Sequence, residues 1–469
     1  MERLSNKTKW IFGLSGIGKD AAYALSTIMF VYLTTYVGMS SAFVGTMFMV
    51  VRIWDAVNDP IMGNIVQNTK SRWGKFRPWI LAGTILNAII VLFIFFNPGM
   101  AAESIQMMIY VTVFYTLWGM SYTLMDIPFW SMIPALSSRQ DDRDSVSALT
   151  RIFTTVGFAL VSAPYLNFAA LFGAGVFDPD QATTAEKANG FFLFAVVISA
   201  LFLVSQLVMV LNVKERVVVD APVEEKVTFK KMWSLLKDND QLMVVMIVVL
   251  ITNFVLYITS TMAFYYIAFN LGDEGLFFPF IALGFVVQIG SIALYTTLAK
   301  KISRKTIYNL SILVQVGAFV GLFINAFLLG DLIPLVFVFG VGVFFGQGLL
   351  MVLTTVFLSD TVEYGELKLG TRSESVVFSV QTFVVKLATG LSMGVVGWGL
   401  SIIGFQSDAS SDVLLPQTDE TLFGISIMMF ILPIFGMLLS RFLFNKYHIL
   451  NEDYYKQVVL DLEEKRRKL

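Results

Sequence analysis

The chain contains no cysteine and a single histidine, His448, and only 14% of its residues are charged. The absence of cysteine excludes disulfides and thiolate metal sites. With one histidine near the C-terminus, most Ser-His-Asp and zinc-histidine chemistry is excluded as well. Average soluble domains carry roughly 25% charged residues, so this chain has too few polar residues to cover the surface of a compact soluble fold. These absences argue against a cytosolic enzyme.

Hydrophobic residues make up 56% of the 469 positions, and the 43 phenylalanines outnumber the 33 lysines and arginines together. This composition is typical of a polytopic membrane protein, whose main partner is the lipid bilayer. The formal net charge is −1, so no bulk basicity indicates a nucleic-acid partner.

Long apolar runs recur along the whole chain. A helix that crosses the ~30 Å hydrocarbon core needs about 20 mostly apolar residues. Twelve runs qualify: 10–36, 41–67, 78–97, 104–133, 145–171, 189–212, 241–270, 276–299, 305–329, 332–358, 374–404 and 421–444. Polar residues 2–9 lead directly into the first run, without the pattern of a cleavable signal. We therefore predict an all-α membrane protein with 12 transmembrane helices and no separate soluble domain.

The charged residues between the runs indicate an orientation. Basic residues concentrate at both termini and in the loops after the second, fourth, sixth, eighth and tenth runs. The alternate loops are acidic and contain one basic residue, Lys187. The positive-inside rule then predicts that both termini are cytoplasmic, in a multi-pass protein of a bacterial-type cytoplasmic membrane.

The longest polar interruption, 213–240, divides the runs into two sets of six. We predict an N-terminal bundle at 1–212, a cytoplasmic linker at 213–240, a C-terminal bundle at 241–445 and a cytoplasmic tail at 446–469. Within the linker, residues 228–238 have the pattern of a short amphipathic helix. Both halves have a basic loop after their second run, at 70–77 and 300–305. Two pseudo-symmetric six-helix halves are typical of the major facilitator fold.

Ionisable residues inside the runs are energetically costly and usually functional. Three of them, Arg52, Asp55 and Asp59, are spaced i, i+3, i+7 and share one helical face. Two carboxylates on consecutive turns can bind a small monovalent cation such as Na⁺ or share a proton. The alternative is a structural ion-pair cluster in which Arg52 and Lys386 balance the acids. The spacing does not choose between Na⁺ and H⁺.

A second group of polar residues lies in the first and fourth runs. Lys19, Asp20 and Asp126 offer donors and acceptors to sugar hydroxyls, and the Trp130 indole can stack on the apolar face of a sugar. Asp126 and Trp130 are i, i+4 neighbours on a helix. Taken alone, Trp130 is better explained as a packing or interfacial residue, because the chain has eight tryptophans.

Two motifs resemble sites of other kinds. Gly13 to Asp20 almost fits a phosphate-binding loop, but Asp20 replaces the Ser or Thr and no strand precedes it. Its glycines, Gly13, Gly16 and Gly18, are better explained by close helix packing. Asp360 and Glu363 resemble an acidic metal site, but they face basic loops at a cytoplasmic helix end. We predict an ion-pair latch there, formed by Arg139, Arg143, Asp360, Glu363 and Arg372.

Several of these motifs together resemble the glycoside–pentoside–hexuronide:cation symporters of the major facilitator superfamily. The matching segments are 18–20, 52–63, 71–79, 122–131, 363–368 and 379–386, and the resemblance runs from residue 10 to about 445. It implies alternating access and sugar import driven by a gradient of Na⁺, Li⁺ or H⁺, without another cofactor. No loop is large enough to hold the catalytic acids of a membrane-embedded enzyme, and we predict that the chain is not an enzyme.

The resemblance also implies residue roles. Asp55 and Asp59 would bind the monovalent cation, with Asn58 and Thr123 as neighbouring oxygen donors. Sugar contacts would come from Lys19, Asp20, Asp126, Trp130 and Arg151. Lys386 would lie near both sites, and Arg52 would pair helices beside the cation. The expected substrate is a galactoside or related oligosaccharide, carried by a monomer. The alternatives are a pentoside or glucuronide symporter, or an uncoupled sugar facilitator of the same fold.

Overall fold

The computed structural model describes residues 3–69, 71–137, 139–215, 229–371, 373–407 and 412–468, and helices form most of this part of the chain, with no strand in it. Residues 216–228 of the predicted linker and Arg372 of the predicted latch lie outside the described residues. The chain forms two compact units.

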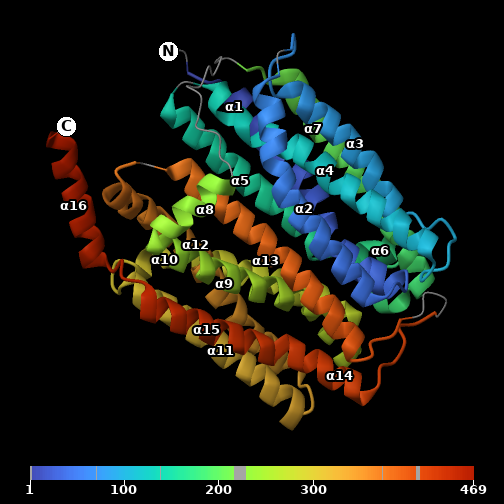
Figure 1. Cartoon of the computed structure of the whole chain (residues 1–469). Helices are drawn as coiled ribbons and strands as arrows, with labels where there is room; N and C mark the ends of the chain where they lie inside the picture. Colours follow the sequence, from blue (N-terminus) through green and yellow to red (C-terminus); the bar gives the residue numbers. More distant parts are fainter. Residues whose placement is uncertain are drawn as a thin grey trace. The chain divides into compact units, whose positions relative to one another are not determined.

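Unit 1 comprises Met1–Glu224 together with two segments from the second half of the chain, Asp273–Phe278 and Gly404–Gln417. Its helices are α1 (Asn6–Val31), α2 (Ser41–Gln67), α3 (Arg77–Phe95), α4 (Ile105–Leu136), α5 (Gln140–Ser162), α6 (Tyr165–Ala174) and α7 (Thr184–Asn212), as Figure 1 shows. The predicted domain ranges place both segments in the C-terminal bundle, whereas the fold packs them in unit 1.

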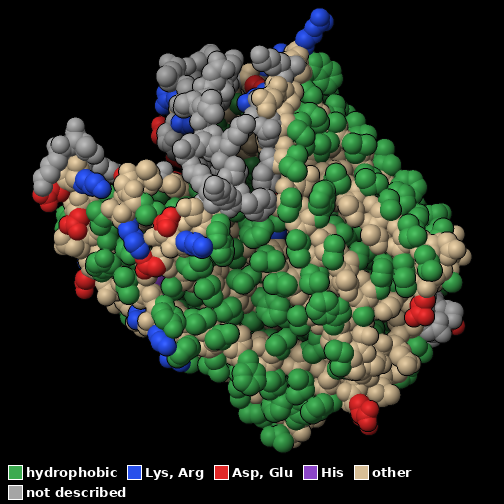
Figure 2. Space-filling view, viewed as in Figure 1, with side chains coloured by type: hydrophobic (Ala, Val, Ile, Leu, Met, Phe, Trp, Pro, Cys, Tyr) green, Lys and Arg blue, Asp and Glu red, His purple; other side chains and the backbone are tan. Residues whose placement is uncertain are grey.

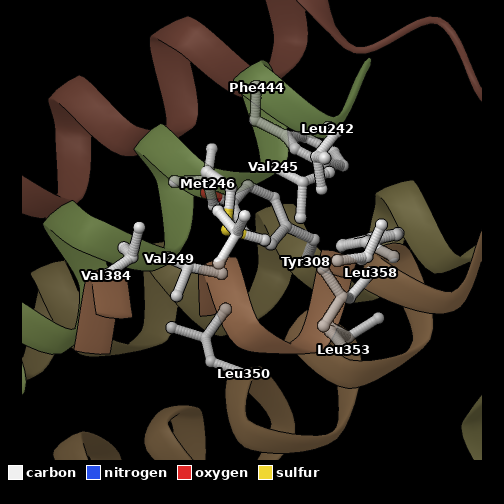
Figure 3. Packing of buried hydrophobic residues seen from close by; sticks show 14 of the residues in the cluster. Leu242, Val245, Met246, Val249, Tyr308, Leu350, Leu353, Leu358, Val384 and Phe444 are labelled. Atoms are coloured by element: carbon white, nitrogen blue, oxygen red, sulfur yellow. The ribbon is translucent and has the colours of Figure 1, made fainter. Parts of the chain in front are cut away.

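Unit 2 comprises Glu225–Gly272, Pro279–Ile403 and Thr418–Leu469. Its helices are α8 (Phe229–Asp238), α9 (Asp240–Tyr265), α10 (Phe277–Leu298, whose first two residues belong to unit 1), α11 (Arg304–Leu328), α12 (Ile333–Leu369), α13 (Glu374–Ile402), α14 (Asp419–Ser426), α15 (Leu432–Tyr447) and α16 (Glu452–Lys468). Figure 3 shows apolar side chains of α9, α11, α12, α13 and α15 packed into one core, with Tyr308 and Phe444 ring centroids 4.1 Å apart.

Nine helices in the described ranges are long and apolar enough to cross a membrane. The other long helices of unit 1, α1, α2 and α4, carry the charged residues singled out in the sequence. Many large hydrophobic side chains on the long helices are exposed, and Figure 2 shows them covering much of the visible face. Such a surface is stable against lipid rather than water. The protein is therefore a multi-pass membrane protein, and twelve spans remain the prediction.

The helices differ from the predicted runs in several places. The run at 145–171 is two helices, α5 and α6, because Pro164 lacks the backbone N–H that would continue the helix. Helix α12 continues to Leu369, eleven residues beyond the predicted end at 358, and stops at Gly370, which has a φ of 74°. The tail forms a further helix, α16, that the apolar pattern did not predict.

A repeated feature ends the first helix of each half. Helix α1 runs into a π-helical turn, Tyr32–Tyr36, and α9 runs into another, Tyr266–Asn270. Both turns are followed two residues later by a glycine with positive φ. The first tyrosine of each turn bonds a residue of its own unit: the Tyr32 hydroxyl donates to Phe95 O at the end of α3 (2.9 Å), and the Tyr266 hydroxyl donates to Asp331 in the connection between α11 and α12. The two halves thus share local structure.

The glycines of α1 pack as predicted. A Cβ on Gly13 or Gly16 would lie 2.8 Å from side-chain carbons of Leu149 or Thr154 on α5. A Cβ on Gly18 would lie 2.1 Å from Ser205 Oγ on α7. These contacts confirm that the glycines allow close helix packing, which fixes α1 and its polar residues against two neighbours.

Candidate functional site

Lys19 is the centre of a charged cluster between α1 and α4 in unit 1. Its ammonium group lies 2.7 Å from Asp20 Oδ1 and 2.7 Å from Asp126 Oδ1, and it donates to the Tyr122 hydroxyl at 3.1 Å. Only 3% of Lys19 is exposed, whereas the two carboxylates retain 22% and 32% side-chain exposure. One buried cation therefore holds two carboxylates whose remaining oxygens are open to a ligand.

Trp130 and Arg151 form the second part of this cluster. The Trp130 indole N–H donates to Asp126 Oδ1 at 3.1 Å, as the i, i+4 spacing on α4 allows. The Arg151 guanidinium on α5 lies 4.2 Å from the centroid of the same ring, and Arg151 is exposed. The indole is thus oriented by a hydrogen bond at its edge and a cation over its face.

The predicted cation residues lie on α2 and the adjoining turns of α4. Asp55 is buried and lies 3.5 Å from Arg52 Nη1, while the Thr123 hydroxyl donates to Asp59 Oδ1 at 3.2 Å. A Cβ on Gly119 would lie 2.6 Å from Asp55 Oδ1, so the glycine leaves room for this carboxylate against α4. Asp55, Asp59 and Thr123 offer the hard oxygen donors that a small cation prefers. Asn58 is half-buried on the same helix.

Aromatic rings connect the two groups. Trp118 lies under the Arg52 guanidinium at 5.5 Å and stacks with Tyr122 at a centroid distance of 5.8 Å. Tyr23 packs against both rings, at 6.4 and 5.1 Å. Trp118 and Tyr122 were not among the predicted site residues. Their signal in the sequence is the spacing of 118, 122 and 126, which repeats every four residues along one face of α4.

Lys386 and the predicted latch residues are the remaining predicted site residues. Lys386 is half-buried on α13 in unit 2. Of the latch residues, Arg139 lies 3.6 Å from Asp141 and 3.9 Å from Asp142 at the start of α5, and Arg143 is half-buried nearby. Asp360 is paired with Arg304 at 2.8 Å within unit 2, and Glu363 is half-buried one turn later. Arg304 is a partner that the sequence pattern did not identify, because it lies 56 positions from Asp360.

The Lys19 cluster and the α2 carboxylates resemble no hydrolytic or redox centre. In the described part of the chain no three His, Cys, Asp or Glu residues are grouped to hold a metal ion. The arrangement instead provides fixed hydrogen-bond donors and acceptors, a half-buried indole and a pair of acids one helical turn apart. These groups can bind a polyhydroxy ligand and a monovalent cation on adjoining turns of α4.

The sequence matches the family described as MFS/sugar transport protein over residues 11–451. It is 27% identical to a raffinose carrier protein of Pediococcus pentosaceus over 470 residues, which is 97% of this chain and 71% of that protein. It is 28% identical to an inner membrane symporter, YicJ, of Escherichia coli K12, over 100% of this chain and 97% of that protein.

Among solved structures, a bacterial homolog of the human lysosomal transporter Spinster has a TM-score of 0.66 with 13% identity, covering 98% of both chains. At that identity the likeness is one of fold, and the fold is that of major facilitator transporters.

Proposed function

The chain belongs to the MFS/sugar transport family, and we propose that it imports a glycoside by symport with Na⁺ or H⁺ through alternating access. The family profile covers most of the chain, and its relatives are sugar permeases and symporters that resemble the glycoside–pentoside–hexuronide:cation family. A galactoside or related oligosaccharide is the proposed substrate class, because the raffinose carrier is among the relatives.

The observation that supports this proposal most is the Lys19 cluster. Lys19 lies at 2.7 Å from both Asp20 and Asp126, and Trp130 is bonded to the same Asp126 oxygen. A sugar needs charged donors and acceptors for its hydroxyls and a flat apolar surface for its ring carbons. Charge-assisted hydrogen bonds are roughly twice as strong as neutral ones, so such a cluster can compete with water for the hydroxyls.

Coupling would operate through α4, since this helix carries residues of both groups. In our proposal the cation binds the oxygens of Asp55, Asp59 and Thr123 and neutralises the two acids. Thr123 is next to Tyr122, whose hydroxyl accepts from Lys19, so ordering this turn also orders the sugar cluster. By linkage, the sugar must then strengthen cation binding by the same factor.

The transport step itself would be alternating access by the two six-helix halves, as in other transporters built from repeats. The predicted cytoplasmic latch would break in this step, whereas Lys386 would lie near the cation and sugar sites and couple them. The predicted coupling ion is Na⁺, Li⁺ or H⁺, and it is cargo rather than a resident cofactor.

Uptake by proteoliposomes containing the purified chain tests the proposal. Labelled raffinose, lactose, a pentoside and a glucuronide are offered in Na⁺ buffer and in choline buffer, with internal pH recorded. We expect a galactoside to accumulate above its external concentration only when a Na⁺ or H⁺ gradient is imposed. Equilibration without accumulation under every gradient would identify an uncoupled facilitator, and no uptake of any sugar would refute the proposed function.

A further inference from the structure

The segment Asp273–Phe278, here called the strap, joins α9 to α10, yet it packs in unit 1. It begins after Gly272, whose φ of 70° turns the chain sharply, and continues as a short 3₁₀ helix, Glu274–Leu276. Positive-inside counting places it on the side of the membrane predicted to be outside. The contacts that Glu274, Gly275 and Phe277 of the strap make with Tyr36, Tyr165, Asp180 and Lys187 all lie within unit 1.

Glu274 fixes the strap through buried charge. It forms an ion pair with Lys187 at the start of α7 and accepts a hydrogen bond from the Tyr36 hydroxyl in the π-helical turn after α1. The exposed fractions of Lys187, Glu274 and Tyr36 are 3%, 4% and 1%. Lys187 also donates to the carbonyl of Pro179 at 3.2 Å. Lys187, the single basic residue of the predicted outer loops, thus binds the strap.

Further contacts hold the backbone and the end of the strap. The Asp180 carboxylate accepts from the backbone N–H of Glu274 at 3.1 Å and of Gly275 at 3.3 Å. Phe277 packs edge-on against Tyr165 of α6, with ring centroids 5.2 Å apart. The strap therefore contacts four parts of unit 1: the turn after α1, α6, the loop before α7, and α7.

The corresponding π-helical turn of the other half, Tyr266–Asn270, makes its contacts within its own unit. Asn270 occupies the position in the second π-helical turn that Tyr36 occupies in the first. Its side-chain amide donates to Leu422 O at 2.9 Å and Ser426 Oγ at 3.0 Å, both on α14 of its own unit. The first turn instead uses Tyr36 to bind a segment that is covalently continuous with α9 and α10.

We propose that the strap is a reversible latch, which binds unit 1 when the outer side is closed and leaves it when the transporter opens outward. This proposal rests on the proposed transport cycle and adds a device to it. The charged character of the latch suits repeated opening. A buried Lys–Glu pair gains Coulomb energy in a dry site but loses hydration, and the two nearly balance. Release returns the hydration, so the open state is accessible.

The charges around Asp180 make the latch sensitive to outside conditions. Asp178, Asp273 and Glu274 are acidic neighbours, and Lys187 is the basic group on the facing helix. Asp178 also caps the turn that holds Asp180, accepting from its backbone N–H at 3.1 Å. Asp178, Asp180 and Asp273 take no part in the Lys187–Glu274 ion pair, so the docked strap brings like charges together. Burial and the neighbouring Asp273 raise the pKa of Asp180 in the docked strap, so ionisation of Asp180 opposes docking and its protonation favours docking.

Cysteine labelling tests the latch directly, because the chain has no native cysteine. A cysteine reporter introduced as Phe277→Cys is buried in the docked strap. A second reporter, Ala185→Cys on α7, is exposed and gives the labelling rate of a fully accessible thiol. Right-side-out vesicles are treated with a membrane-impermeant maleimide. Adding Glu274→Gln should raise the labelling rate of the Phe277 reporter by roughly tenfold or more, because it leaves Lys187 buried without its counter-charge. Adding Glu103→Gln, an exposed acid of another outer loop, should change nothing.

A second variant separates release of the latch from damage to the fold. Lys187→Met combined with Glu274→Gln removes both charges and keeps a partner for the Tyr36 hydroxyl. Its labelling rate should return to within about threefold of the reporter background, because replacing a whole buried pair is often neutral. Equal labelling rates of the Phe277→Cys reporter with and without Glu274→Gln would overturn the proposal that the strap is a reversible latch. So would high labelling in the background itself.

A cross-link tests whether release is needed for transport. A Cβ on Gly275 would lie 3.3 Å from Asp180 Oδ2, so Asp180→Cys with Gly275→Cys places two thiols close together. Oxidation should form a disulfide and stop sugar uptake, and a reductant should restore it; the two single variants should be insensitive. Failure to cross-link, or full uptake after cross-linking, would overturn the proposal. If the parent carries no sugar, the proposed function fails, whereas the labelling experiment still decides whether the strap docks and releases.

Discussion

Replacement of Lys19 by methionine gives the sharpest test of the proposed sugar site. The ammonium lies 2.7 Å from one oxygen of each of Asp20 and Asp126. At an effective dielectric constant of 20, each attraction has a gross value of about 6 kcal/mol. Most of this is offset by desolvation of the buried lysine, so the net value is much smaller. Its loss leaves two carboxylates facing each other without a cation between them.

The effect on sugar affinity follows from that charge imbalance. Without the ammonium that holds them, the two carboxylates repel each other, so at least one of them no longer has a fixed position from which to accept a hydrogen bond from the sugar. A hydrogen bond to a charged group contributes about 1.5–3 kcal/mol. Loss of one such bond weakens sugar binding by about 10- to 150-fold. Lys19→Met should therefore bind the transported sugar at least about tenfold more weakly.

Lys9→Met is the matched control. Lys9 is a second buried lysine of α1 and lies 2.7 Å from Asp142, away from the sugar cluster. Both variants should lose thermal stability, because Lys9→Met leaves the buried Asp142 without its ammonium partner and Lys19→Met leaves Asp20 and Asp126 without theirs. Calorimetric titration with sugar should distinguish them: Lys9→Met retains parental affinity within about twofold, whereas Lys19→Met does not. Parental sugar affinity in a folded Lys19→Met protein would refute the assignment of the cluster.

Three further outcomes are expected. Gly119→Ala places a Cβ 2.6 Å from Asp55 Oδ1 and should raise the Na⁺ concentration needed for half-maximal uptake, measured by Na⁺ titration. Trp130→Phe removes an indole N–H that is bonded to a carboxylate, so sugar binding should weaken by about 5- to 30-fold in calorimetry, from a loss of about 1–2 kcal/mol. Burial and a neighbouring aspartate raise the pKa of Asp180 to about 6 from an ordinary value of 3.8. The docked strap therefore binds this proton more tightly than the released strap, and docking weakens as pH rises from about 4 to about 6. The thiolate fraction of any cysteine falls with pH, so the Phe277→Cys rate is divided by the rate of the exposed Ala185→Cys reporter at the same pH. This ratio should be higher at pH 7 than at pH 4.5, and Asp180→Asn should remove the difference.

Local spacing predicted which charged residues of α2 share a helical face. The period of an α-helix places Arg52, Asp55 and Asp59 on one face, and the cost of charge in lipid marks them as functional. The structure brings Lys19 to Asp20 and Asp126, and Thr123 to Asp59, as the sequence and the family resemblance together suggested. Lys19 and Asp20 are neighbours in sequence, and the other contacts join α4 to α1 and to α2.

Contacts between residues that lie far apart in the chain could not be predicted from the sequence. Lys187 and Glu274 are 87 positions apart, and no periodicity connects a loop acid with a lysine on another helix. The same holds for Arg304 and Asp360, which pair within unit 2 although they are 56 positions apart. The helix ends were also hard to predict. Helix α12 continues past its apolar run because its last turns pack on the tail helix α16, which makes them stable without an apolar sequence.

Gradient-driven accumulation in proteoliposomes tests the central claim, that Asp55 and Asp59 couple sugar movement to a cation. The comparison is between the parent chain and Asp59→Cys, with labelled galactoside and an imposed inward Na⁺ or H⁺ gradient. The parent should accumulate sugar above the external concentration, whereas Asp59→Cys should only equilibrate it and should retain sugar exchange. Accumulation against a gradient by Asp59→Cys would contradict the account.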